Sequence, residues 1–488
     1  MLQLIINGKK AILPPDVSLG VQLKNTLIVD REEDATYPFT LPIYANRHIF
    51  KFPDLINNND FVRKYTGCVV FGPYQILFGE VIVTDVSDTE IELYVSTNNR
   101  TFWGKYGSKF LDEFDIGSEA WSYDIFNASL RTYKPYVCTQ LYDPSFSAAG
   151  YIPEFYNRWK MVDVCLQKTQ NGIKNNICPF MRLTEVVKLI FSAAGYVILY
   201  NAMDDVAGFK DIIIVFRHTF NEPATFSYNE VLPHITIREF LDECKRKFGF
   251  AFFINEANKT VVIRSSSVLR SEQTIGLEIL NGLQKTIDSD AEGKVYKFTD
   301  KSVTDQFLNT YTNDLSYITG DENSENIESV ECISTIVGVQ EKLEHFFSGE
   351  TDSSGEEVFL NVRYDLLSTT SLFENTEFRL ACYNGLVNGI QNSGSAGIPT
   401  GKFLVPFANP GSLLWPILYN KFHKSFCETD KSITIDLDLR SNVLMLVNLQ
   451  AMFVNNVICR NQRFVVKEQE IEFLADRISS HKVTVIPI

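Results

Sequence analysis

Two stretches in the middle of the chain repeat one pattern, and this repeat constrains the fold most. "LTEVVKLIFSAAGYVILY" (183–200) and "ITIREFLDECKRKFGFAFFI" (235–254) each place apolar residues on one helical face, then pass through glycine and an aromatic residue into a strand-like run. Aligning the two glycines predicts one helix–strand unit, repeated 54 residues apart, whose copies share a core. Chance amphipathicity explains each helix. It explains less easily why a glycine, an aromatic residue and a strand-like run follow both helices. The matched pairs are Leu183 with Ile237, Val186 with Phe240, Val187 with Leu241, and Ile190 with Cys244.

Local signals predict where both helices begin and end. Thr236 and Glu239 have the spacing of a capping box, and Gly249 follows the last helical residue of the second copy. In the first copy, Thr184 or the residue before it is expected to cap the start, and Gly195 is expected to end the helix. The second copy then turns at "EANK" and returns as "TVVIR", which predicts a hairpin.

The first 115 residues carry the pattern of short β-strands. Asn7-Gly8 lies between two apolar runs and is a strong hairpin signal. Residues 73–96 contain two more alternating runs around a turn at Ser87. Several short strands without a helical period indicate a small barrel or sandwich.

One segment of this region, "ATYPFTLPIYANRHIF" (35–50), combines an apolar alternation with prolines. Tyr37, Phe39 and Leu41 alternate with Pro38, Thr40 and Pro42, so the segment is predicted to be extended with one apolar face. Because proline has no N–H to donate, the segment cannot be a central strand and is predicted to lie at a sheet edge.

The rest of the chain returns to β-patterns after the repeat. Acidic or Gly/Ser-rich insertions interrupt it, and mobile loops are predicted at 320–357 and 391–402. The fold class that follows is α+β, mainly β, with two barrel-like β-domains flanking a domain with a repeated helix–strand unit. The predicted parts are an N-terminal β-domain at 1–115, a polar and aromatic connecting region at 116–182, the helix–strand domain at 183–270 and a second β-rich domain at 271–488.

Composition excludes several classes of protein. The apolar runs are of strand length, so no membrane span is predicted, and "MLQLIINGKK" lacks the order of a signal peptide. Nine cysteines without a C-x-x-C motif indicate reduced thiols and synthesis in a cytosol. A formal charge of −15 opposes nucleic-acid binding, because phosphate contacts need clustered lysine and arginine.

A search for catalytic or cofactor motifs gives no site. The sequence has no zinc-type histidine spacing, no phosphate-binding glycine loop and no nucleophile elbow. The densest carboxylates lie in polar insertions, where a solvated surface is expected rather than a catalytic pair. No catalytic, cofactor-binding or metal-binding residue is therefore predicted, and the chain is not expected to be an enzyme. The residues considered were His48, His218, His234, His345, His423 and His481, and, for sugar binding, Trp103, Trp121, Trp159 and Trp415.

Several blocks of the sequence resemble the tail-hub or baseplate-hub proteins of bacteriophages and related contractile injection machines, most closely those of Bacteroidetes phages and prophages. The blocks are "TYPFTLPIYANRHIF", "ILFGEV", "LPHITIREFLDECKRKFGFAFFINEANKTVVIR" (232–264), "LYNKFHKSF", "NQRFVVKEQEIEF" and "KVTVI". They follow one another in order over most of the chain. None of them is an active-site signature.

The resemblance implies a structural virion protein. Three copies would form a ring that joins the hexameric tail tube, or a distal tail protein, to the tail spike or needle. DNA would pass through the channel without specific binding, and the proline-stiffened edge would be a pre-ordered docking strand. The location implied is the virion tail, assembled in the host cytoplasm. Two alternatives stay open: a tail-associated cell-wall hydrolase, and a receptor-binding tail module.

Overall fold

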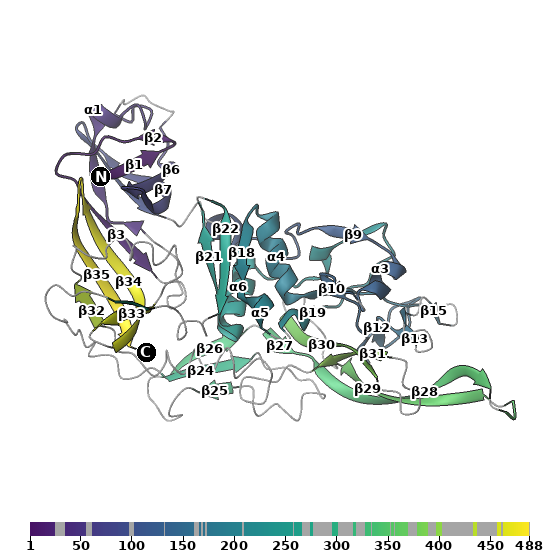
Figure 1. Cartoon of the computed structure of the whole chain (residues 1–488). Coiled ribbons are helices and arrows are strands. Elements are labelled where there is room, and N and C mark those ends of the chain that lie inside the picture. The colour runs from purple at the N-terminus through teal and green to yellow at the C-terminus, as the bar shows by residue number, and fades with distance from the viewer. Residues whose placement is uncertain are drawn as a thin grey trace. The chain divides into compact units, whose positions relative to one another are not determined.

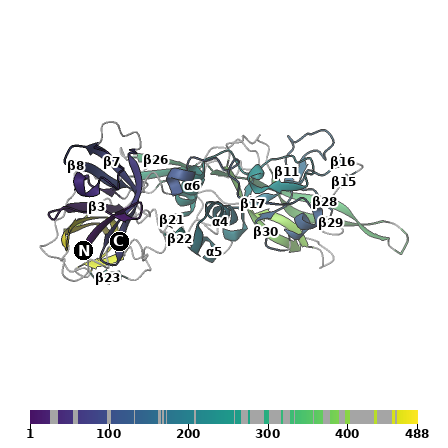
Figure 2. The same cartoon turned by 90° about the horizontal axis from the view of Figure 1, so that it is seen from above.

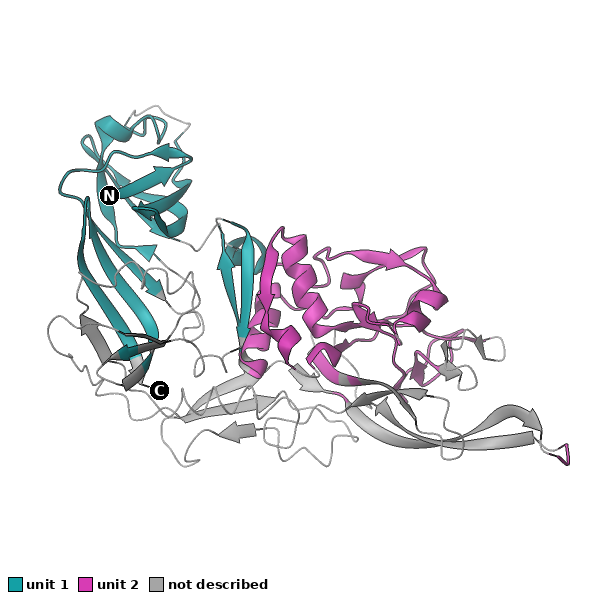
Figure 3. Cartoon of the chain, viewed as in Figure 1, with its two compact units in different colours: residues 1–108, 250–294, 421–488 teal, residues 109–249, 295–420 magenta. Residues whose placement is uncertain are grey.

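The computed structural model divides the chain into two compact units, which Figure 3 distinguishes by colour. Unit 1 comprises Met1–Ser108, Phe250–Lys294 and Lys421–Ile488, and unit 2 comprises Lys109–Gly249 and Val295–Asn420. The residues that the structure describes are 1–24, 35–54, 61–96, 102–130, 132–160, 165–166, 169–170, 173–206, 209–256, 258–265, 274–276, 295–300, 316–318, 327–332, 334–351, 353–355, 357–368, 378–388, 397–402, 433–436, 456–459 and 462–487.

Unit 1 is built on one large sheet with the order β2-β1-β6-β7-β8-β4-β3-β34-β33-β23, to which β5, β32 and β35 add at its sides (Figures 1 and 2). Its N-terminal strands are β1 (Leu2–Ile6), β2 (Lys9–Lys10), β3 (Ser18–Lys24), β4 (Ala35–Thr36), β5 (Phe39–Pro42), β6 (Lys64–Phe71), β7 (Tyr74–Val86) and β8 (Glu90–Ser96). The other strands of this sheet are β23 (Thr274–Gly276), β32 (Ile433–Asp436), β33 (Asn456–Cys459), β34 (Gln462–Leu474) and β35 (Ile478–Pro487). Outside this sheet, β21 (Phe250–Asn255) and β22 (Thr260–Ser265) pair as an antiparallel hairpin. Two short helices, α1 (Ile43–Asn46) and α2 (Phe102–Tyr106), complete the unit.

The predicted hairpins of unit 1 are present. Asn7 and Gly8 both take positive φ, of 48° and 77°, and turn β1 into β2. β7 and β8 pair antiparallel around the turn at Ser87, whose hydroxyl accepts from the Glu90 N–H at 3.0 Å. Since alternate residues of a strand face opposite sides, β8 buries Ile91, Leu93 and Val95 in the core.

The proline-containing segment forms an edge strand, but its apolar face differs from the prediction. β5 pairs with β8, and no other strand pairs with β5 among the described residues. Phe39 and Leu41 are buried in the core of unit 1, whereas Tyr37 is 52% exposed, so the three do not share a face. The reason is a change of partner: the Tyr37 N–H donates to Gly20 of β3 at 2.9 Å before the chain reaches β8. The apolar alternation thus builds this chain's own core rather than a free docking edge.

The two ends of the chain meet in the same sheet. β3 and β34 pair antiparallel from Ser18 opposite Leu474 to Lys24 opposite Glu468. The fold is α+β and mainly β, as predicted, but the described strands do not close into a barrel, and these terminal regions share one open sheet. The physical reason is that β4 pairs with one edge of β3, and the backbone groups of the other edge need a partner, which the last long strands supply.

Unit 2 contains three larger sheets and the two predicted helices (Figure 1). The sheets have the orders β10-β17-β19-β30-β27 with β31 on β30, β12-β11-β29-β28, and β25-β24-β26, and β9 pairs with β20. The helices are α3 (Tyr123–Ala128), α4 (Leu183–Ala193), α5 (Ala202–Asp205) and α6 (Ile237–Phe248), with 3-10 turns at Phe209–Asp211 and Tyr228–Val231. Among these helices and those of unit 1, none is long and apolar enough to cross a membrane.

The strands of unit 2 come from two parts of the chain. Residues 116–182, for which no element was predicted, supply α3 and the first strands. These strands belong to two of the larger sheets and to the two-stranded sheets β13-β14, β15-β16 and β20-β9. Before α4 these are β9 (Ser118–Ala120), β10 (Tyr136–Val137), β11 (Leu141–Tyr142), β12 (Phe155–Tyr156), β13 (Trp159–Lys160), β14 (Cys165–Leu166), β15 (Thr169–Gln170), β16 (Ile173–Lys174) and β17 (Phe180–Arg182). After α4 they are β18 (Val197–Asn201), β19 (Ile212–Val215), β20 (Thr225–Ser227), β24 (Val295–Asp300), β25 (Ser316–Ile318), β26 (Ile327–Cys332), β27 (Ser334–Ile336), β28 (Gly338–Thr351), β29 (Glu357–Ser368), β30 (Phe378–Asn388) and β31 (Gly397–Lys402).

The helical halves of the predicted repeat are confirmed. α4 buries Val186, Val187 and Ile190, and α6 buries Phe240, Leu241 and Cys244, all fully. The capping box of α6 is present, with the Glu239 N–H donating to the Thr236 hydroxyl at 3.2 Å. Gly195 and Gly249 both take the left-handed conformation after their helices, with φ of 81° and 68°.

Other details of the repeat differ between the copies. α4 begins after Arg182, which makes no side-chain cap, so the prediction of a cap at Thr184 or the residue before it was wrong. Thr184 is fully buried and binds other side chains instead. β18 exposes Val197 and Leu199 by 62% and 64%, whereas β21 buries its first residues. The boundary between the two units falls at Gly249, so the β21–β22 hairpin belongs to unit 1.

The insertions predicted as loops contain strands. β26, β27 and β28 lie within 320–357, and β31 occupies 397–402. β28 pairs with β29 from Gly338 opposite Ser368 to Thr351 opposite Glu357, so the hairpin turn is confined to 352–356. Acidic and small residues give little local strand signal, and the long ladder of backbone hydrogen bonds outweighs that preference.

Candidate functional site

The residues considered for chemistry lie in separate places. Trp103 and Trp121 pack edge-on against Phe102 and Phe126, with ring centroids 5.3 and 4.9 Å apart. Trp159 lies in β13, His345 lies in β28, and Trp415 and His423 lie outside the described residues. Within the described part of the chain, no three His, Cys, Asp or Glu side chains are grouped as a metal site would require.

His218 and His234 contact neighbouring side chains that explain them by the fold. His218 packs on Phe220, with ring centroids 4.3 Å apart, and burial lowers its pKa. His234 contacts both carboxylate oxygens of Asp112, at 2.9 and 3.0 Å, and stacks on Phe110. These contacts hold the chain segment before α6 in place.

Four cysteines have described side chains, and they are poor nucleophiles. Cys138, Cys178 and Cys244 are buried, and burial raises the pKa of all three thiols, to about 12 for Cys178. Cys68 is partly exposed, and burial also raises the pKa of its thiol. Since the thiolate is the reactive form, neutral pH leaves these side chains unreactive.

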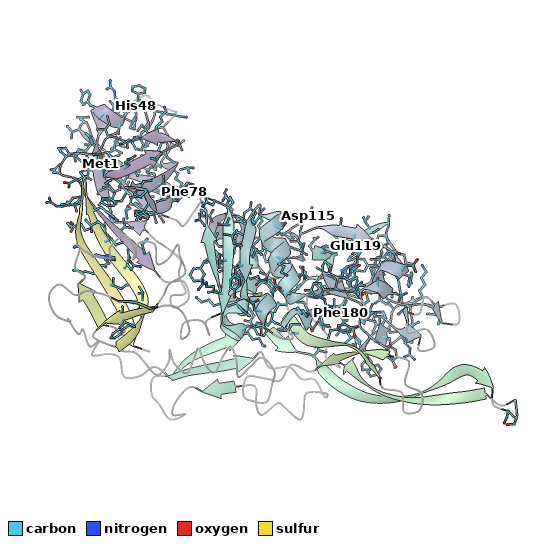
Figure 4. The ribbon with its side chains drawn as sticks, viewed as in Figure 1. Met1, His48, Phe78, Asp115, Glu119 and Phe180 are labelled. Atoms are coloured by element: carbon cyan, nitrogen blue, oxygen red, sulfur yellow. The ribbon has the colours of Figure 1, made fainter. Side chains whose placement is uncertain are left out.

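Glu119 on β9 is the centre of a polar cluster in unit 2 (Figure 4). Its carboxylate accepts hydrogen bonds from the Tyr136 hydroxyl at 2.7 Å and the Lys134 ammonium at 2.9 Å. Burial, together with the hydrogen bond to Glu119, raises the pKa of Tyr136. Phe226 packs against Tyr136 at a centroid distance of 5.5 Å, so the carboxylate is anchored inside an aromatic cluster. This arrangement ties strands together and leaves no acid or base poised for reaction.

Two buried ion pairs serve the same purpose. The Arg182 guanidinium is 4% exposed, donates to Asp211 at 3.0 Å and lies 4.7 Å from the ring of Tyr133. The Asp143 carboxylate is fully buried and lies 2.9 Å from the Arg217 guanidinium. A buried charge is tolerated when it is paired, so both arginines are explained by the fold.

A different kind of surface lies at the α1 end of unit 1. We call Tyr44, Arg47, His48, Lys51 and Phe52 the α1 surface. Tyr44 is 78% exposed and Phe52 is 42% exposed, and the Arg47 guanidinium lies 5.3 Å from the first ring and 5.5 Å from the second. His48 is exposed beside α1 and is labelled in Figure 4. Aromatic side chains and arginine are enriched at protein interfaces.

An acidic surface borders the α1 surface. Asp85, Asp88, Glu90 and Glu92, which we call the acidic turn, lie where β7 turns into β8, and the first three are exposed. The Ile43 N–H at the start of α1 donates to the Thr89 carbonyl at 2.9 Å, which places the two surfaces side by side. The sequence contains no lysine or arginine between 65 and 99 to neutralise these carboxylates.

Sequence reasoning missed both surfaces. The signal was present in "YANRHIFKF", where two cations and a histidine alternate with aromatics in a chain of net charge −15. The apolar alternation that precedes it drew the interpretation toward a docking strand. Only the fold shows that Phe50 points into the core while Phe52 points to solvent.

Comparisons with known proteins give similar solved structures at low identity. No protein-family model matches the sequence, and no curated protein matches it. A 43 kDa tail protein of prophage MuSo2 from Shewanella oneidensis is similar at 9% identity and a TM-score of 0.39, over 100% of this chain and 97% of that one. A tail protein from Neisseria meningitidis is similar at 8% identity and a TM-score of 0.35, over 100% and 96%.

A component of the type VI secretion system of Escherichia coli is also similar. The identity is 8% and the TM-score 0.32, over 99% of this chain and 76% of that one. That protein itself exhibits structural similarity to two tail proteins of bacteriophage T4. At scores below 0.5 these likenesses carry no argument about the function of this chain.

Proposed function

We propose that this chain is a structural hub protein of a phage-type tail. Three copies form a closed ring that joins the tail tube to the tail-tip spike around a DNA channel. The proposal rests on the sequence blocks that resemble tail hubs and on the part that each block plays in the fold. It includes the absence of catalytic activity.

The observation that carries the proposal is that the described blocks are building elements. Residues 36–50 form β5 and α1, residues 76–81 lie in β7, and residues 232–264 form α6 and the β21–β22 hairpin. The last blocks form β34 and β35, and β34 pairs with β3 near the other end of the chain. The described blocks bury apolar residues such as Phe39, Leu241 and Phe464, and the block at 418–426 lies outside the described residues. Such a chain is suited to assembly.

The charge is consistent with a conduit. An excess of 15 acidic charges lowers the local concentration of DNA phosphate near the protein. A ring made from such chains therefore lets DNA slide past without sticking. Specific DNA binding is not part of the proposal.

The experiment that tests the tail role is localisation in assembled particles. Antibodies against the purified chain, used on tails or injection particles from cells that express it, are expected to label the tail tip. Mass spectrometry of the same particles is expected to give half as many copies of this chain as of one hexameric tube ring. Particles that lack the chain, or carry it along the whole tail, would contradict the proposal. Release of peptidoglycan by the purified chain would contradict the absence of catalysis.

A further inference from the structure

We infer that the α1 surface and the acidic turn of one copy bind those of a neighbouring copy of the same chain. The inference rests on the proposed function, which requires contacts between copies, and names the surface that makes one of them. The proposed ring alone does not indicate which surface of unit 1 makes the contact between copies.

The backbone under the α1 surface is strained in a way that displays Phe52. Lys51 and Phe52 take φ of 57° and 59°, although neither is glycine. This conformation is unfavourable for a residue that has a Cβ atom, and it persists only where the surroundings hold it. Here the Phe52 N–H donates to the Arg47 carbonyl at 2.7 Å, and the neighbouring Phe50 is fully buried against Tyr65. The strained backbone is held in this conformation by its surroundings, and it places the ring of Phe52 at the surface.

The α1 surface also has a fixed base. Asn46 is fully buried and its amide donates to the Ile12 carbonyl at 2.9 Å, while its oxygen accepts from the Ile12 N–H at 2.8 Å. These two hydrogen bonds clamp α1 onto the chain after β2. A surface that is already ordered loses less conformational entropy when it binds, which favours association.

Charge indicates that the partner is another copy. Arg47 and Lys51 place two cations at the surface, and Asp54 lies 3.5 Å from Arg47 as its partner within the chain. The acidic turn beside them presents four carboxylates. Around a threefold axis the cationic α1 surface of each copy can face the acidic turn of the next copy, so patches of opposite charge meet in a contact that closes after three copies.

Nucleic acid fits these residues less well. Phosphate backbones are bound by several lysine and arginine side chains along a track, and the affinity depends on their number. The α1 surface offers two cations next to four carboxylates, which would repel phosphate. DNA binding is therefore not proposed, and it is one of the results that would contradict the inference in the test below.

The test uses charge reversal in the full chain, with the mass of the oligomer measured by analytical ultracentrifugation over a dilution series. Arg47→Glu with Lys51→Glu is expected to weaken self-association about tenfold or more, because like charges then face each other. Asp88→Lys with Glu90→Lys is expected to weaken it similarly. All four substitutions together restore complementarity and are expected to return the affinity to within about threefold of the wild type.

A matched control separates this effect from general charge. Lys9→Glu with Lys10→Glu makes the same charge change at exposed positions of β2 in unit 1, and it is expected to leave self-association unchanged. Phe52→Gly adds a second test, because it is expected to affect the melting temperature and self-association in different directions. It relieves the positive φ and so is expected to keep or raise the melting temperature, while it weakens self-association by removing the ring.

The outcomes separate the inference from the proposed function. A trimer that all variants form as well as the wild type overturns the inference and leaves the ring. If the wild type forms an oligomer other than a trimer, and Arg47→Glu with Lys51→Glu disrupts it, the result supports the inference and contradicts the threefold ring. Three results overturn the inference. They are a quadruple variant that self-associates as weakly as either charge-reversed pair, a wild type that stays monomeric, and a variant that loses only binding to a DNA duplex.

Discussion

Asn157 shows how single residues hold unit 2 together. It is fully buried with a φ of 56°, a conformation that asparagine tolerates better than most residues. Its amide donates to the carbonyls of Thr139 and Cys178 at 3.0 and 2.7 Å, and its oxygen accepts from the Cys178 N–H at 2.8 Å. One side chain thus joins three chain segments of a region that has only short strands. Nothing in the local sequence indicated this role.

His481 is expected to make stability depend on pH. It is buried, it contacts Gln469 at 3.1 Å, and burial lowers its pKa to about 4 from an ordinary value of 6.5. Between these values the unfolded chain binds a proton that the folded chain does not, so stability falls as pH falls through this window. His481→Gln is expected to remove roughly 2 kcal/mol of that dependence, measured by urea unfolding at pH 4.5 and 7. Equal pH slopes in both proteins would contradict the assignment.

Leu241 is expected to be a cavity site. It is fully buried on α6, so Leu241→Ala removes packing that the surroundings cannot fully replace and is expected to cost roughly 2–5 kcal/mol. Leu199→Ala on β18 is the matched control, because Leu199 is 64% exposed, and it is expected to change stability by about 0.5 kcal/mol or less. Chemical unfolding measures both. Similar losses in the two variants would sink the assignment of the α6 core.

At the scale of elements, the sequence predicts what is encoded locally. The helices, the Asn7-Gly8 hairpin and the α6 capping box all depend on residues within a few positions of one another. The pairing of β3 with β34 joins residues such as Ser18 and Glu472, which are 454 positions apart. No local pattern specifies such a partner, and therefore the sequence predicted separate β-domains where the structure has one sheet.

The surfaces at the α1 end show the same limit. "YANRHIFKF" contains the residues of the α1 surface, but their exposure depends on the turn after α1, where Lys51 and Phe52 adopt positive φ. Non-glycine residues seldom adopt that conformation, so a sequence pattern does not indicate it. The acidic turn becomes its neighbour only through the pairing of β5 with β8. The candidate site was therefore accessible only through the fold.

The tip of the β28–β29 hairpin is expected to contribute little to stability. The β28–β29 pairing is regular from Gly338 to Phe347, shifts register after Phe347, and includes Thr351 opposite Glu357 as its last pair before the connection at 352–356. Replacing 352–356 with Asn-Gly shortens the connection to a turn that favours hairpins, and it is expected to change the free energy of unfolding by about 0.5 kcal/mol or less. Urea unfolding measures the change. A loss of about 2 kcal/mol or more would show that the tip packs against the rest of the unit.

At the scale of the whole molecule, net charge and symmetry act together. An acidic chain that forms a closed ring presents an excess of negative charge to anything that passes through it. A contact that is not self-complementary must close into a ring or grow into a fibre, so a defined copy number is itself evidence for closure. The adjacent cationic and acidic surfaces of unit 1 offer one such contact.

The purified chain is expected not to bind DNA. With a net charge of −15 it repels phosphate, and no retardation of a labelled duplex is expected at about 0.15 M salt. The Lys9→Glu, Lys10→Glu variant serves as a control and is expected to behave identically. Binding that weakens steeply as salt rises would reveal a basic track and would contradict the proposal of a non-adhesive channel.

The most direct test of the central claim is the native mass of the purified full chain, measured by mass photometry and by light scattering behind a sizing column. The account predicts a single closed species with three times the 55.6 kDa mass of one chain, without larger polymers at higher concentration. A monomer or a twofold dimer as the dominant species would contradict the threefold ring, and with it the proposed place of this protein between tube and spike.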